Sequence, residues 1–116
     1  METKTIPPAQ WRTLFDSLAR IHGGDAATLE ILAADLGAQM EVEDAPLSGI
    51  SYDSSGLELH FAPHGGHVVH RIAKPKRVAI EEGEDGLVAA IEIEADGEPT
   101  RVLRLSAPVA ARLLTA

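Results

Sequence analysis

The chain has 116 residues, a formal net charge of −8 and no cysteine. This length predicts one domain over residues 1–116, with a core that needs no disulfides. The acidic balance argues against nucleic acid as a partner, because affinity for nucleic acid rests largely on neutralising phosphates. The chain lacks both a signal-peptide core and an apolar run of about 18 residues, so we expect no membrane partner and a cytoplasmic location, which the absence of cysteine also fits.

The first predicted element is an amphipathic helix whose first turn contains Pro7 and Pro8. Gly23-Gly24 ends it. Between them, large apolar residues recur at the three- and four-residue spacing of one helix face, which should dock on the core; they are Trp11, Leu14, Phe15, Leu18 and Ile21. We expect residues 1–6, before this helix, to be disordered or extended.

From residue 26 the apolar period changes to two, which predicts strands. About eight short alternating segments follow, separated by turn signals such as "DSSG" and Asp96-Gly97. The connections are too short for parallel crossovers. We therefore predict an α+β fold in which the N-terminal helix packs on a curled or partly closed antiparallel β meander.

The last predicted element is a short C-terminal helix within residues 107–116. Ser106 is a candidate N-cap, and Pro108 would lie in the first helical turn. On such a helix Val109 and Leu113 would share an apolar stripe.

The stretch "FAPHGGHVVHRI", residues 61–72, contains three of the five histidines and follows directly on His60. We predict a hairpin in which Phe61 lies opposite Val68, since slipping the register by one residue would set apolar against polar side chains along the ladder. In this register His70 points to the apolar face, while His60 and His67 lie on the outer face.

Two interpretations of these histidines compete. His60 and His67, with Glu58, could hold a metal ion in an open site. However, Glu58 lies opposite Arg71, which would neutralise it, so an ordinary polar surface is favoured. His70 is expected to be a half-buried imidazole with a local hydrogen-bond partner, and alternatively a titratable group in a pocket.

A basic cluster stands out in this acidic chain. "RIAKPKR" contains Arg71, Lys74, Lys76 and Arg77, which form either a solvated turn or a contact for an anionic partner. No nucleophile motif, phosphate loop or cofactor fingerprint accompanies it. We therefore predict no cofactor and assign no catalytic residue.

Val88, Ala90 and Val102 are apolar residues on the predicted outer face of a hairpin. A half-exposed antiparallel sheet should alternate throughout, so something is expected to cover them. The candidates are the C-terminal segment and a second copy of the chain. We accordingly expect a homodimer.

Four stretches in order resemble an uncharacterised bacterial family catalogued as domain of unknown function 5335. They are "IPPAQWRTLFDSLARIHGG", "LGAQMEVEDAPLSGISYD", "HRIAKPKRV" and "AAIEIEADGEPTRVLRL". The resemblance implies a small, β-rich cytoplasmic domain and brings no activity or cofactor. It draws attention to Arg20, His22 and His70, although His22 could simply cap the carbonyls at the end of the helix.

The function remains unknown from the sequence, with a small non-enzymatic binding or assembly domain as the leading hypothesis. The first alternative is a small hydrolase or isomerase that uses His70, with His22, as acid or base; it requires His70 and a carboxylate to converge in a pocket. The second is a metal-binding module, which requires His60 and His67 to converge.

Overall fold

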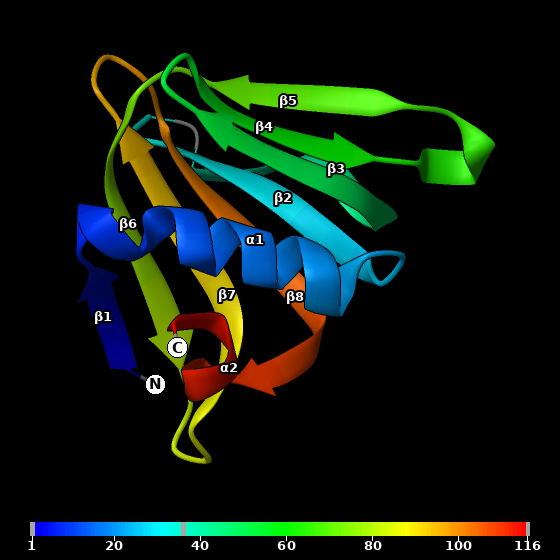
Figure 1. Cartoon of the computed structure of the whole chain (residues 1–116). Coiled ribbons are helices and arrows are strands. Elements are labelled where there is room, and N and C mark those ends of the chain that lie inside the picture. Colours follow the sequence, from blue (N-terminus) through cyan, green and yellow to red (C-terminus); the bar gives the residue numbers. More distant parts are fainter. Residues whose placement is uncertain (1, 36, 116) are drawn as a thin grey trace.

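The computed structural model describes residues 2–35 and 37–115. In this part of the chain an N-terminal helix, eight antiparallel strands in one unclosed sheet and a short C-terminal helix confirm the predicted fold class (Figure 1). The elements are β1 (Glu2–Ile6), η1 (Pro8–Gln10), α1 (Trp11–His22), β2 (Ala26–Ala33), β3 (Gly37–Asp53), β4 (Gly56–Phe61), η2 (Pro63–Gly65), β5 (Val68–Ile72), β6 (Pro75–Glu82), β7 (Leu87–Ala95), β8 (Thr100–Ala110) and α2 (Ala111–Thr115).

Helix α1 lies across the sheet (Figure 1). Trp11, Phe15 and Leu18 are buried, as predicted. The Trp11 indole Nε1–H donates to the Ile6 carbonyl oxygen at 2.8 Å, which ties the helix to the end of β1. Trp11 and Phe15 also contact the Tyr52 ring of β3, with ring centroids 6.4 and 5.5 Å away.

The sheet is strongly curled. Its strand order is β1-β6-β7-β8-β2-β3-β4-β5, so β5 is one edge while β6 lies next to the other. Only Ala73 and Lys74 separate β5 from β6, and three Cα–Cα steps of ~3.8 Å reach at most about 11 Å. The two ends of the sheet must therefore approach each other, although no pairing between β1 and β5 closes it within the described residues.

Strand β3 makes the bend that this curl requires. Its first half, through Pro46, pairs with β2, and its second half, from Leu47, pairs with β4. Near the end of the first half, Asp44 adopts a positive φ of 49°, and its backbone N–H donates to Thr28 Oγ1 at 3.0 Å. The bend turns β4 and β5 over the inner face of the other strands, so side chains of β5 can meet those of β8.

The β4–β5 hairpin has the predicted register. Phe61 pairs with Val68, Leu59 with His70 and Leu57 with Ile72. Leu57, Leu59, Phe61 and Ile72 are fully buried on the inner face. His70 shares that face, and His60 lies on the opposite one.

The C-terminal segment differs from the prediction. Ser106 to Ala110 continue β8 as strand, so the helix α2 starts only at Ala111, and the predicted N-cap at Ser106 is wrong. The reason is that Val109 pairs with Val88, which extends the ladder beyond Pro108. Residues 2–6 form the edge strand β1; Met1 and Ala116, the ends of the two predicted terminal segments, lie outside the described residues.

The apolar residues that suggested a dimer are buried within one chain. A register shift between Val88 and Ala90 places Val88 in the inner core, so its predicted position on the outer face is wrong. Ala90 and Val102 are also buried, and their ladder neighbours on the outer face are the long charged side chains Glu30, Glu81, Glu92 and Arg104. Such side chains cover apolar surface with their aliphatic stems.

Candidate functional site

His70 belongs to a polar cluster at the rim of the curled sheet, which we call the rim cluster (His70, Glu98 and Arg101). The Arg101 Nε–H donates to His70 Nε2 at 3.2 Å. Arg101 Nη1 donates to Glu98 Oε1 at 2.6 Å and to the Pro99 carbonyl at 3.2 Å. Arg101 is only 8% exposed and lies on β8, so the cluster joins strands that are far apart in the sheet order.

The chemistry of the rim cluster follows from its donors. A guanidinium can only donate, so His70 Nε2 must be the unprotonated ring nitrogen. Burial lowers the pKa of His70 below its ordinary 6.5, and the Arg101 charge lowers it further, while Glu41 and Glu98 oppose the shift. His70 is therefore a neutral imidazole near pH 7 whose free lone pair is already engaged. His70 is half-buried, as predicted, but its hydrogen-bond partner is the distant Arg101 side chain instead of a local group.

The sequence pattern did not single out Arg101 and Glu98, although the position of Arg101 in its strand could have indicated them. Leu103 and Leu105 are buried on β8, and the period of two in a strand places Arg101 on the same face. An arginine on a core face needs a compensating partner. Glu98 stands three residues before it, in the turn that precedes β8.

The outer face of the β4–β5 hairpin brings His60 and His67 together. His60 Nδ1 and His67 Nε2 are 3.2 Å apart, and the two rings are almost parallel, with an interplanar angle of 16°. Glu58 Oε1 lies 3.3 Å from His60 Nε2, and Glu58 Oε2 accepts from Arg71 Nη1 at 2.8 Å. Within the described residues, no group of three or more His, Cys, Asp or Glu side chains is placed to hold a metal ion.

His22 is buried at the end of α1, with 3% of its surface exposed. Its Nδ1 lies 3.3 Å from Asp25 Oδ2, so it engages a side chain beyond the helix in place of the carbonyl-capping role that was considered. Its Nε2 is buried and has no hydrogen-bond partner among the described residues. Arg20, two residues earlier on α1, is exposed, and His22 and Arg20 do not join the rim cluster.

The basic cluster is dispersed by ion pairs. Arg71 engages Glu58 and also donates through Nη2 to the Ser55 carbonyl at 2.8 Å. Lys76 lies 3.0 Å from Asp96, and Lys74 is exposed in the connection between β5 and β6, with a positive φ of 47°. These residues do not form a concentrated anion-binding patch.

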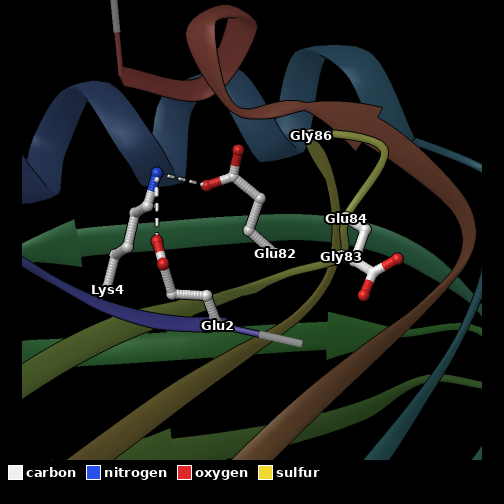
Figure 2. A pocket seen from close by; sticks show the side chains of 6 residues that line it. All are labelled: Glu2, Lys4, Glu82, Gly83, Glu84 and Gly86. Atoms are coloured by element: carbon white, nitrogen blue, oxygen red, sulfur yellow. Dashed lines mark ion pairs between the residues drawn. The ribbon is translucent and has the colours of Figure 1, made fainter.

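A surface hollow of about 420 Å³ lies at the other edge of the sheet, where β1 meets the β6–β7 turn. Figure 2 shows Lys4 pointing toward both Glu2 and Glu82, with Nζ–Oε distances of 3.5 and 2.8 Å. Glu84, Gly83 and Gly86 complete its lining. His70 does not line this hollow, so the pocket that the acid–base hypothesis requires is not found there.

Taken with the fold, these features define an α+β domain whose half-open antiparallel sheet is covered by one helix. In this part of the chain no helix is long and apolar enough to cross a bilayer. The profile of DUF5335, a family of unknown function, matches residues 2–113, and the chain belongs to that family.

One curated relative aligns with most of the chain. The chain is 38% identical over 108 residues to an uncharacterized protein of Aquifex aeolicus (strain VF5), an alignment that covers 90% of this chain and 93% of that protein. No solved structure matches the chain.

Proposed function

We propose that the protein is a small, non-enzymatic assembly domain that pairs with a second copy of itself through the open edge of β5. The observation that carries this proposal is the apolar character of that edge. Val68 and Val69 are 41% and 44% exposed, on a strand that has a neighbour on one side only. An unpaired strand edge offers free backbone N–H and C=O groups to another strand.

The opposite edge of the sheet, β1, carries charged side chains that oppose pairing with another strand. Strand β1 carries Glu2 and Lys4, and Glu82 of its neighbour β6 engages Lys4. Charged side chains on an edge strand are a common means of preventing edge-to-edge pairing. Strand β5 carries one charged side chain, Arg71, which Glu58 neutralises, and its first two residues, Val68 and Val69, are apolar.

The charge around β5 also supports a second copy as the occupant. A net charge of −8 makes two copies repel each other over most of their surfaces. Near β5, however, Arg71 is balanced by Glu58 and Lys76 by Asp96. The β5 edge is thus close to neutral, and two-fold pairing there brings no large like charges together.

The non-enzymatic part of the proposal rests on His70. A general base needs a free lone pair directed at the substrate proton, and His70 Nε2 instead accepts from Arg101. We also propose a cytoplasmic location, because a chain without cysteine fits a reducing compartment.

The test is light scattering of the purified chain at tens of micromolar, comparing the unaltered protein with Val69→Lys. We expect a dimer for the unaltered chain and a monomer for Val69→Lys, because a lysine at the edge opposes strand pairing. Met40→Lys is the matched control: Met40 is 60% exposed on β3, so its replacement should leave the dimer intact. A monomeric unaltered chain, or a Val69→Lys variant that still dimerises, would refute the proposal.

A further inference from the structure

His60 and His67 lie side by side on the outer face of the β4–β5 hairpin. His60 comes from β4, and His67 stands immediately before β5. We propose that His60 Nδ1 and His67 Nε2 together bind one divalent transition-metal ion, with water in the remaining positions, and that Glu58 orients His60 for this role. The proposal does not depend on dimerisation.

The separation of the two nitrogens fits a shared metal ion. Zinc–imidazole bonds are about 2.0–2.1 Å long, so two nitrogens in a tetrahedral arrangement lie roughly 3.3 Å apart. His60 Nδ1 and His67 Nε2 are 3.2 Å apart. His67 is exposed in the segment before β5, so its ring can turn to direct the nitrogen lone pair at a metal without moving the sheet.

Glu58 has a different role from the one considered in the sequence analysis. Its two carboxylate oxygens face His60 Nε2 and Arg71 Nη1, so it is not a free metal ligand. His60 Nε2 is buried and has no hydrogen-bond partner among the described residues, although Glu58 Oε1 lies within ion-pair distance, off the ideal hydrogen-bond direction. A proton on Nε2 that faces this carboxylate leaves Nδ1 with the lone pair that binds metal. Carboxylates commonly orient metal-binding histidines in this way.

The ion class follows from the ligands. Imidazole nitrogens suit Zn²⁺, Ni²⁺ and Cu²⁺, whereas Mg²⁺ and Ca²⁺ require oxygen ligands. Structural zinc sites use four protein ligands, and this one supplies two, so binding is exchangeable and weaker than at a structural site. The exposed position of His67 leaves room for water or a ligand from another molecule.

The experiment is calorimetric titration of the tag-free chain with zinc chloride, combined with ¹H–¹⁵N spectra of the histidine side chains. We expect one zinc ion per chain and a shift of two imidazoles, at His60 Nδ1 and His67 Nε2. His60→Ala and His67→Ala should each weaken binding at least about tenfold, and Glu58→Gln by about tenfold, as the loss of an orienting partner does. Thermal melts in the presence of a chelator should be unchanged by these substitutions, because all three side chains lie on the outer face.

The matched control is His64→Ala in the neighbouring loop, which should bind zinc as tightly as the unaltered chain. The absence of saturable zinc binding would overturn the proposal. So would unchanged binding in His67→Ala, or a loss in His64→Ala equal to that in His67→Ala, since the ion would then be collected by exposed histidines in general.

Discussion

Arg101 on β8 donates its Nε–H to His70 Nε2 on β5 across 3.2 Å. Three strands, β2, β3 and β4, separate these two in the sheet order. The hydrogen bond therefore spans the inside of the curl and fixes how far β5 folds over the remainder of the sheet. Glu98 balances the charge of Arg101 and holds the guanidinium in place.

Arg101→Ala should destabilise the protein by about 2–3 kcal/mol. Removing one member of a buried charged pair leaves the other without compensation, and Glu98 is partly exposed, which reduces the cost. Urea denaturation gives the free energy of unfolding. Lys76→Ala is the control, because the side chains of Lys76 and Asp96 are both exposed, and their ion pair should contribute less than about 1 kcal/mol. Equal losses in both variants would show that the rim cluster has no special role.

Stability should fall as the pH drops below about 6.5, in part because of His70. The pKa of His70 is lowered in the folded protein, so between that value and 6.5 the unfolded chain binds a proton that the native state does not. Its contribution is complete above pH 6.5 and is lost as the pH falls. His70→Gln keeps an acceptor for Arg101 and removes the titration, so its urea midpoint should fall less between pH 8 and pH 5.5. An identical decrease of the urea midpoint in His70→Gln and in the unaltered protein would contradict this prediction. His64→Gln, in the exposed loop, is the control.

Glu81→Gln should stabilise the protein at neutral pH. Burial raises the pKa of Glu81, and the nearby Glu92 carboxylate raises it further. The native state therefore holds a proton above pH 4.5 that the unfolded chain has released, and stability declines as the pH rises through this window. Because Glu81 is partly exposed, the gain should stay below about 1 kcal/mol. Thermal melts at pH 4 and pH 7 measure it, and Glu84→Gln in the exposed turn should change neither.

Leu114→Ala should cost about 2–4 kcal/mol, as expected for a leucine that leaves a cavity. Leu114 is fully buried in α2, which packs against α1, whereas its neighbour Leu113 is 44% exposed. Leu113→Ala should therefore stay within about 0.5 kcal/mol of the unaltered chain. Denaturation curves of the two variants decide the question, and a small effect at Leu114 would show that α2 is a peripheral addition to the fold.

The elements that followed from the sequence are those with a strong local period. The spacing of Trp11, Phe15 and Leu18 predicts the face of α1 that the structure buries. The alternation along residues 57–72 predicts the register of the β4–β5 hairpin. The prediction failed where a short segment lacked a decisive period: residues 106–110 fit the start of a helix by their serine and proline, but pairing of Val109 with Val88 keeps them in the sheet.

The convergence of His60 and His67 also followed in part from the sequence, because a hairpin register places them on one face. The 3.2 Å separation of their nitrogens, and the assignment of Glu58 to both His60 and Arg71, depend on rotamers that no sequence pattern specifies.

By itself the sequence determined the helix α1, the β4–β5 hairpin and the faces on which the residues of that hairpin lie, because these depend on interactions between residues close in the chain or joined by a short turn. Only the tertiary structure decided that His70 meets Arg101, that Val88 pairs with Val109, and that β5 remains an open edge. The physical reason is that the curl of the sheet is set by the bend of β3 at Asp44 and by packing against α1. The curl brings together strands that are far apart in the chain, and no local sequence pattern specifies such a contact.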